Sequence, residues 1–247
     1  MTAPQFMTTP QGRHIAFHVT QGAGPGVVFL GGFKSDMTGS KAVHLQSWAD
    51  ATGRAFLRLD YSGHGASGGA FEDGCIGDWA ADAMAVIEAV TTGPQVVVGS
   101  SMGGWIALLV ARAMPERVAG LVGIAAAPDF TNAIWDAASA EARSILMETG
   151  RVEQPSEYAA EPYVITRKLI MDGRKQQVLT TPLDLPFPVR LLQGSNDTDV
   201  PVAMAVRLLE HARCPDMQLK VVKGADHRFS TAACLAMIVA AVEEVLG

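Results

Sequence analysis

A serine flanked by glycines, in the segment Gly99-Ser100-Ser101-Met102-Gly103, lies between a strand-like run and a helix-like run. The apolar, β-branched residues 95–98 are typical of a buried strand, and residues 105–114 are typical of a helix that stops at Pro115. A serine on such a turn is held in a tight, strained elbow, and its neighbours must be small because the two backbones come close together. We therefore expect the hydroxyl of Ser101 to stand clear of the sheet, where the positive helix N-terminus favours a developing oxyanion.

Other interpretations of this glycine-rich turn have to be weighed. A structural turn that happens to carry a serine is an equally good account of an isolated G-x-S-x-G. A phosphate-binding loop requires Lys and then Ser or Thr after its glycines, whereas Trp105 follows Gly104 here. The glycines of residues 22–26 precede a predicted strand, whereas a dinucleotide-binding loop follows one. The rest of the chain must therefore decide between a structural turn and a nucleophile.

Length and composition limit the classes of protein that this chain can represent. Its 247 residues, 49% hydrophobic and 18% charged, predict one ordinary globular domain over residues 1–247. A formal net charge of −6 argues against a nucleic-acid partner, which requires a basic face. We expect no transmembrane segment and no secretory signal, because no apolar run is long enough. Three scattered cysteines indicate reduced thiols in a cytoplasmic protein, not a disulfide framework or a metal site.

Strand-like and helix-like runs alternate over most of the chain. Short apolar runs predict strands at residues 5–9, 14–20, 27–30, 55–59, 95–98, 118–125, 189–193 and 217–222. Longer runs predict helices at residues 40–52, 76–90, 105–114, 201–212 and 231–246. The first two strands resemble a hairpin, and the alternation after them predicts an α/β fold whose mostly parallel sheet has helices on both faces.

Residues 128–188 break this alternation. They contain helix-like pieces at 133–148 and 155–172 and no clear core strand, and the stretch is long for a crossover connection. Because it lies between two strands of the sheet, we expect it to form a helical lid above the carboxyl edge, with ordinary crossover helices as the alternative. Its apolar residues are expected to pack on the body, with a subset lining an acyl pocket: Phe130, Ile134, Trp135, Ile145, Leu146, Met147, Tyr158, Tyr163, Val164, Ile165, Leu169, Ile170 and Met171. Its cations are expected to be solvated unless one turns inward to meet a substrate carboxylate: Arg167, Lys168, Arg174 and Lys175.

A serine hydroxyl is a poor nucleophile at neutral pH and needs a positioned base. His227 lies in a polar loop between the last predicted strand and the last helix, on the same sheet edge as Ser101. His64 is the rival, because it also follows a strand at that edge, although its glycine-rich loop can use it structurally. The remaining histidines lie on the hairpin or on predicted helices and are expected to be solvated or packed: His14, His18, His44 and His211.

The third group must fix the tautomer of the imidazole and stabilise the imidazolium. Asp197 follows a predicted strand and is our candidate acid. Asp199, two residues nearer the next helix, can serve as an N-terminal cap instead. Asp226 adjoins His227 in the chain, and adjacent side chains rarely face each other. Asp129 follows the strand after the elbow and is the weaker alternative.

An oxyanion hole requires two backbone N–H groups. One should come from Met102, the residue after the nucleophile. The other should come from the loop that begins Gly31-Gly32-Phe33, where two glycines let the backbone turn inward, and the N–H of Phe33 is our candidate. A simple turn at the end of a strand is the alternative.

These loops occur in the order Ser101, Asp197, His227, and the sequence resembles the α/β-hydrolase family, which has that order. It resembles most a group of α/β-hydrolase-domain proteins known as mitochondrial palmitoyl-protein thioesterase and mycophenolic acid acyl-glucuronide esterase. The similar segments are GFKSDMTGSKA at 32–42, DYSGHGAS at 60–67, GSSMGGW at 99–105, VRLLQG at 189–194 with Asp197 and Val200-Pro201, and DHR at 226–228. The residues at 33–42 are much more specific than the G-x-S-x-G.

The sequence departs from this group in three places. We expect no N-terminal targeting extension like that of the mitochondrial members, so the resemblance does not imply mitochondrial import. Gln193 stands where many members have histidine, a change that we expect to be harmless because it lies outside the triad. The divergent lid at 128–188 leaves the substrate unspecified.

The residues and the resemblance together imply a serine hydrolase without a cofactor or metal that cleaves carboxylic esters or thioesters. The expected substrate is a small molecule or an acylated protein, and the oligomeric state is not predicted. Lactones, simple lipase esters and carbon–carbon bonds are alternatives for a similar triad. A third hypothesis is a protein of the same fold that only binds a ligand or a partner.

Overall fold

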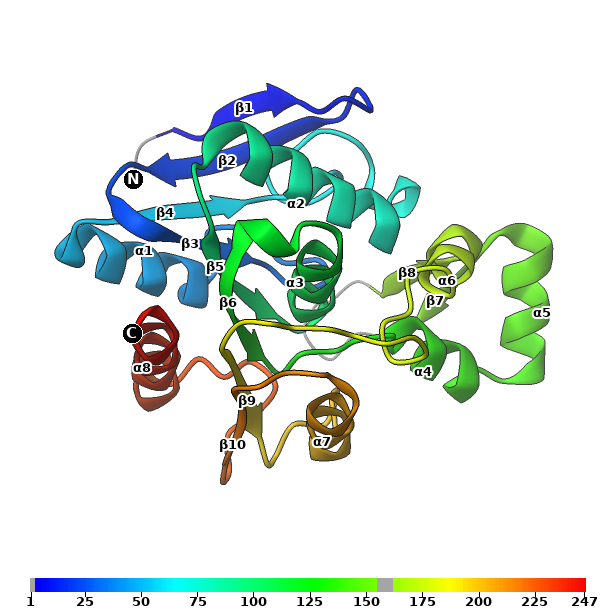
Figure 1. The fold of residues 1–247 in the computed structure, drawn as a ribbon. Coiled ribbons are helices and arrows are strands. Elements are labelled where there is room, and N and C mark those ends of the chain that lie inside the picture. The colour runs from blue at the N-terminus through cyan, green and yellow to red at the C-terminus, as the bar shows by residue number, and fades with distance from the viewer. Residues whose placement is uncertain (1–2, 155–161) are drawn as a thin grey trace.

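The computed structural model describes residues 3–154 and 162–247 (Figure 1). One eight-stranded sheet has the strand order β1-β2-β4-β3-β5-β6-β9-β10. Only the pairs β1–β2 and β2–β4 in this sheet are antiparallel. The strands are β1 (Gln5–Thr8), β2 (His14–Thr20), β3 (Ala23–Leu30), β4 (Arg54–Leu59), β5 (Gln95–Ser100), β6 (Val118–Ile124), β9 (Val189–Gly194) and β10 (Met217–Val222). The predicted α/β class with a mostly parallel sheet is confirmed.

Helices cover both faces of this sheet. Helices α1 (Ser40–Thr52) and α8 (Ala232–Leu246) lie on one face, and α2 (Ile76–Val90), α3 (Met102–Ala113) and α7 (Val202–His211) lie on the other (Figure 1). Alternate residues of each strand serve the two cores: Val27 and Phe29 pack with α1 and α8, whereas Val28 and Leu30 pack with α2 and α3. Burial on both faces explains why the sequences of these strands are nearly continuous apolar runs. Each large side chain buried in this way contributes roughly 1.5–3 kcal/mol.

The register of the parallel strands brings four strand ends to one edge. Leu30 at the end of β3 pairs with Gly99 of β5, and Val222 at the end of β10 pairs with Gly194 at the end of β9. Strand β6 joins the two halves, since it pairs with β5 on one side and β9 on the other. The loops that follow β3, β5, β9 and β10 therefore emerge side by side.

Between β6 and β9, the described residues form five smaller elements that lie together at the right of Figure 1. They are α4 (Phe130–Ala137), α5 (Ala140–Thr149), β7 (Arg151–Gln154), β8 (Tyr163–Thr166) and α6 (Arg167–Gly173). The predicted helix at 133–148 is two helices, because Ser139 starts a new one by accepting a hydrogen bond from the Ala142 N–H.

The predicted helix at 155–172 is wrong in part. Residues 163–166, which are rich in aromatic and β-branched side chains, form β8 and pair antiparallel with β7. Thr166 then caps α6 by accepting from the Leu169 N–H. Residues 155–161 of that prediction, including Tyr158, lie outside the described residues. Within the described ranges, no helix combines the length and apolarity needed to cross a bilayer.

Candidate active site

Ser101 occupies a sharp turn between β5 and α3. Its φ of 55° and ψ of −119° are strained for a residue with a side chain. The helix begins at Met102, three residues before the predicted start, so the strand turns into the helix within one residue. The turn depends on Gly103, where an added Cβ would lie 2.1 Å from the Leu30 carbonyl oxygen. The expected elbow is therefore present, and the chain behind it is packed backbone to backbone.

The structure brings together the three side chains predicted to do the chemistry. The Nε2 of His227 lies 3.0 Å from the Oγ of Ser101. The Nδ1 of the same ring lies 2.9 Å from Oδ2 and 3.1 Å from Oδ1 of Asp197. Because an ionised carboxylate only accepts, Nδ1 carries the ring proton and Nε2 accepts from the Ser101 hydroxyl. This arrangement can remove the hydroxyl proton during nucleophilic attack.

The Asp197 carboxylate is held by several donors besides the imidazole. Its Oδ1 accepts from the N–H groups of Val200, at 2.8 Å, and Asp199, at 3.0 Å. Its Oδ2 accepts from Nε2 of Gln193 at 2.9 Å. Burial alone would raise the pKa of Asp197, but the hydrogen bonds from His227, Val200 and Gln193 hold it below its ordinary value. The carboxylate thus stays ionised beside the base. Gln193, which we expected to be harmless because it is not part of the triad, contacts the acid through its amide.

The loop that carries Asp197 packs directly on the loop that carries His227. The Asn196 N–H donates to the Ala225 carbonyl at 2.9 Å, and the Ser195 N–H donates to the Val222 carbonyl at 2.9 Å. Gly194 makes this contact possible, since a Cβ there would lie 2.2 Å from the Ala225 oxygen. Two loops that are distant in sequence therefore form one rigid support for the imidazole.

The backbone after His227 is strained and is held in place by a lysine. Phe229 is fully buried with a φ of 48°, and its N–H donates to Oδ1 of Asp226 at 3.1 Å. Lys41, on α1, donates from Nζ to the Arg228 carbonyl at 2.6 Å. Burial, with a smaller contribution from the nearby Arg228 charge, lowers the pKa of Lys41 to about 8. Lys41 thereby connects α1, which follows the predicted oxyanion loop, to the histidine loop.

The loop after β3 approaches Ser101 closely. An added Cβ on Gly32 would lie 3.4 Å from the Cβ of Ser101. Two hydrogen bonds hold the next residues, from the Lys34 N–H to Nε2 of His64 at 3.3 Å and from the Met37 N–H to Oδ1 of Asp60 at 2.6 Å. Among the described residues, the N–H groups of Phe33 and Met102 have no acceptor. Both candidate donors are therefore available to an oxyanion.

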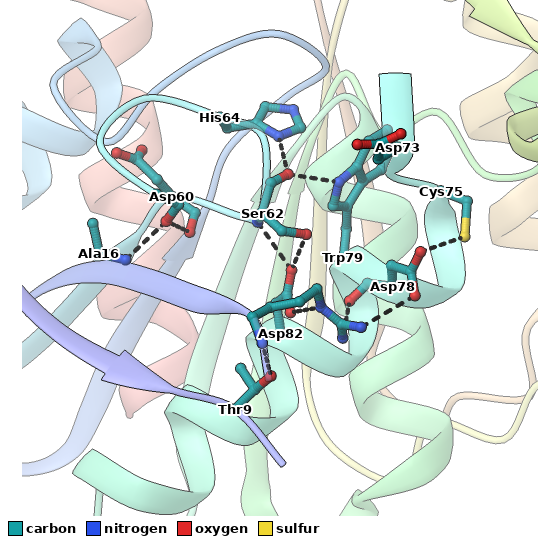
Figure 2. A network of polar contacts seen from close by, with 12 residues as sticks. Thr9, Ala16, Asp60, Ser62, His64, Asp73, Cys75, Asp78, Trp79 and Asp82 are labelled. Carbon is teal, nitrogen blue, oxygen red and sulfur yellow. Dashed lines mark hydrogen bonds and ion pairs between the residues drawn. The ribbon is translucent and has the colours of Figure 1, made fainter. Parts of the chain in front are cut away.

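His64, the rival base, has a different environment. It is buried, its Nδ1 lies 3.2 Å from the Ser62 carbonyl, and its Nε2 accepts from Lys34. Burial lowers the pKa of His64, which favours the neutral ring. Figure 2 shows that Ser62 is held from below by Asp82, whose Oδ2 accepts from the Ser62 N–H at 2.9 Å and hydroxyl at 2.7 Å. His64 therefore supports the loop after β3.

Neither Asp129 nor Asp199 takes the place of Asp197 as the hydrogen-bond partner of the imidazole. Asp129 accepts from the N–H groups of Val178 and Leu179, at 2.9 and 3.1 Å, and burial raises its pKa. Asp199 Oδ2 lies 3.9 Å from Nδ1 of His227, beyond hydrogen-bond distance. The expected capping of α7 by Asp199 is wrong, because the N-cap is Pro201 and no side chain caps that helix.

A cluster of aromatic rings surrounds Phe33. Its ring meets those of Phe71, Trp79, Phe130 and Tyr163 edge-on, with centroids 4.8 to 6.0 Å apart. Phe130 and Tyr163 come from residues 128–188, so part of the apolar set expected to face the elbow does reach the loop after β3.

Three of the four cations considered in residues 128–188 have partners away from the triad. Lys168 pairs with Asp78 at 2.7 Å, Arg167 donates to the Met147 carbonyl, and the Arg174 guanidinium lies over the Trp135 ring. Lys34, which follows Phe33 in the loop after β3, also contacts the aromatic cluster, with its Nζ 5.1 Å from the centroid of the Phe71 ring. Sequence analysis did not predict this contact. No residue pattern had marked it as different from other exposed lysines.

Asp197, Asp199 and His227 offer metal-ligand atoms within 4.8 Å of one another. Two of them are the acid and base already described, and hydrogen bonds account for their positions. This set therefore needs no metal to explain its geometry.

Comparison with known proteins places this geometry among hydrolases. A model of the alpha/beta hydrolase family matches residues 27–235. The mitochondrial palmitoyl-protein thioesterase ABHD10 of Rattus norvegicus is 32% identical over 246 residues, which are 99% of this chain and 83% of that protein. A crystal structure of a protein from Agrobacterium vitis S4 superposes with a TM-score of 0.95 at 40% identity, covering 99% of this chain and 98% of that one. The alpha/beta hydrolase domain-containing protein 10 from mouse gives 0.91 at 31%, covering 98% of each chain.

Proposed function

The chain belongs to the alpha/beta hydrolase family, and on that premise we propose that it is a serine hydrolase that cleaves carboxylic esters or thioesters. Ser101 is the nucleophile, His227 the general base and Asp197 the group that orients the base. The observation that carries this proposal is the pair of hydrogen bonds on His227, to Ser101 at one nitrogen and to Asp197 at the other.

Acylation is the first half of the reaction. The Oγ of Ser101 attacks the acyl carbon while its proton moves to Nε2 of His227, and the carbonyl π electrons move onto oxygen. The N–H groups of Phe33 and Met102 stabilise that oxyanion at the positive end of α3. When the oxyanion collapses, the bond to the leaving group breaks, and the alcohol or thiol departs with the proton from Nε2.

Deacylation repeats these steps with water as the nucleophile. His227 takes a proton from water as its oxygen bonds to the acyl carbon. The second oxyanion collapses, the carboxylic acid leaves, and Oγ regains a proton from Nε2. Asp197 stays ionised throughout and stabilises the imidazolium that forms in each half.

The substrate class rests on the relatives and on the aromatic cluster. Curated relatives are named palmitoyl-protein thioesterases, which supports an acyl thioester or related activated ester, small or protein-borne, as substrate. The rings around Phe33 supply apolar surface beside the oxyanion loop. We take residues 128–188 as a lid inserted in a single domain, residues 1–247. The free cysteines support a reducing location such as the cytoplasm.

Labelling with a fluorophosphonate probe tests the proposal, with Ser101→Ala and Ser100→Ala as a matched pair. Ser100 is the buried neighbour at the end of β5. The protein and Ser100→Ala should be labelled, and Ser101→Ala should not, with turnover reduced by several orders of magnitude, since triad residues act as a unit. A folded wild-type protein that takes no label would favour a non-catalytic binding protein.

A further inference from the structure

Gln193 is a buried polar side chain at the end of β9. It is 1% exposed, and its Nε2 lies 2.9 Å from Oδ2 of Asp197 and 2.9 Å from the Val200 carbonyl oxygen. The two N–H groups of the amide therefore meet two acceptors. The opposite orientation would place the amide oxygen against both of those oxygens, so chemistry determines which way the amide faces.

The Asp197 carboxylate has few other hydrogen-bond donors that could take the place of the Gln193 amide. Oδ1 accepts from the Val200 and Asp199 N–H groups, whereas Oδ2 accepts only from the imidazole and Gln193 among the residues that the structure describes. The Asp197 side chain is fully buried. Bulk water therefore does not contact this carboxylate in the folded protein.

The same amide also closes the acid loop. It binds Asp197 in the middle of the loop and Val200 at its end, and the Val200 N–H returns to Oδ1 of Asp197. The carboxylate is consequently fixed at both oxygens, by the Gln193 amide at Oδ2 and by the Val200 N–H at Oδ1. We propose that Gln193 is a positioning residue of the active site, which fixes the Asp197 carboxylate against Nδ1 of His227. This inference rests on the proposed triad.

Stability alone gives a poor account of a glutamine at this position. Its Oε1 is buried and finds no hydrogen-bond partner among the described residues. A buried acceptor without a partner is destabilising, and an apolar side chain like those of Leu191 and Leu192 would avoid it. The donor side of the amide is therefore the part that this position requires.

The test compares Gln193→Met with Gln95→Met. Gln95 is also a buried glutamine, but its Nε2 donates to the Thr92 and Gly93 carbonyls at the start of β5, at the far end of the strand from Ser101. Both variants lose a buried donor, and thermal unfolding measures what each loss does to the fold. Only Gln193→Met should lower kcat, by about tenfold, with KM nearly unchanged.

The pH dependence of kcat/KM separates a positioning role from a structural one. The titratable groups recorded around Asp197 are His227 and Asp199. Without the Gln193 donor the carboxylate is more basic, so the Asp197–His227 pair keeps its proton to higher pH. The acid limb should therefore move to higher pH in Gln193→Met and stay in place in Gln95→Met. Gln193→His, which retains a ring N–H donor, should recover most of the lost kcat.

Each outcome decides the inference. A normal kcat and an unmoved acid limb in Gln193→Met would overturn it. A loss of activity that is fully explained by a smaller folded fraction, as we expect for Gln95→Met, would also overturn it. If Gln193→Met does not fold, Gln193→Leu decides, because it also lacks a donor and matches the apolar neighbours Leu191 and Leu192; full activity of that variant would refute the role. Asp197→Asn separates the two proposals. If that variant keeps full activity the triad itself fails, whereas if it is inactive beside a normal Gln193→Met only the present inference fails.

Discussion

The Nε2 of His227 lies 3.0 Å from the Oγ of Ser101, although 126 positions separate the two residues in the chain. Their contact depends on the strand order, because the loops after β5 and β10 leave the same edge of the sheet, with β6 and β9 between those strands. The acid loop after β9 fills the remaining distance, since it packs on the histidine loop and presents Asp197 to the far side of the ring. The loops after β5, β9 and β10 thus bring Ser101, Asp197 and His227 into contact.

Asp197→Asn should reduce kcat by a factor on the order of 10⁴ without unfolding the protein, because the asparagine amide favours the wrong tautomer of the imidazole, as it does in serine proteases. Asp129→Asn is the matched control, since Asp129 is a buried aspartate that binds backbone N–H groups elsewhere. It should lower stability and leave kcat per folded molecule nearly intact. Steady-state rates and circular dichroism of both variants measure this. A crippled Asp129→Asn beside an active Asp197→Asn would mean that the acid is misassigned.

The contribution of Lys41 to stability should depend on pH. Its pKa falls from 10.5 to about 8 in the folded protein because its charge is partly desolvated. Between these values the folded protein has released a proton that the unfolded chain still binds, so wild-type stability relative to Lys41→Met should rise with pH across that window. Urea denaturation at a series of pH values measures the difference. Lys223→Met, at an exposed lysine, controls for the loss of one charge. A stability difference that stays constant with pH would contradict the expectation.

Two cations that bind neighbouring aspartates on α2 should differ greatly in their effect on stability. Arg13 binds the fully buried Asp82 at 2.5 Å, whereas Lys168 binds Asp78 at 2.7 Å and is itself 52% exposed. Arg13→Met leaves a buried carboxylate without its cation and should lower the free energy of unfolding by about 3–5 kcal/mol. Lys168→Met should lower it by less than about 1 kcal/mol. Chemical denaturation compares the two variants, and equal losses would be evidence against this reasoning.

Acyl chain length should affect the rate. The apolar rings around Phe33 favour an apolar acyl group, so octanoyl thioesters or activated octanoyl esters should be cleaved faster than their acetyl counterparts. Peptides and phosphoesters should be poor substrates. Values of kcat/KM on matched substrates measure this preference, and Phe71→Ala, which removes one ring of the cluster, should reduce it. A strict preference for acetyl groups, or substantial peptidase activity, would overturn the assignment.

Features that depend on neighbours in the chain were predictable. The helices at 40–52 and 76–90 and the strands at 14–20 and 217–222 have the predicted boundaries, because the spacing of apolar residues and the ends at glycine or polar residues are local signals. The same locality explains the errors. Ser139 interrupts a helix by capping a new one, and residues 163–166 join a strand only because β7 offers a partner. A window of sequence contains no information about that partner.

The sequence by itself determined the elements of the main sheet, their alternation and a small set of candidate residues, since each follows from local spacing and from the chemistry of side-chain types. Only the tertiary structure decided among the candidates. His64 and His227 both follow strands, yet one supports the loop after β3 and the other meets Ser101. Gln193 was expected to be harmless, and only the structure showed that its amide donates to Asp197. The physical reason is that hydrogen bonds act over about 3 Å, and strand order and register, not position in the chain, determine which side chains come that close.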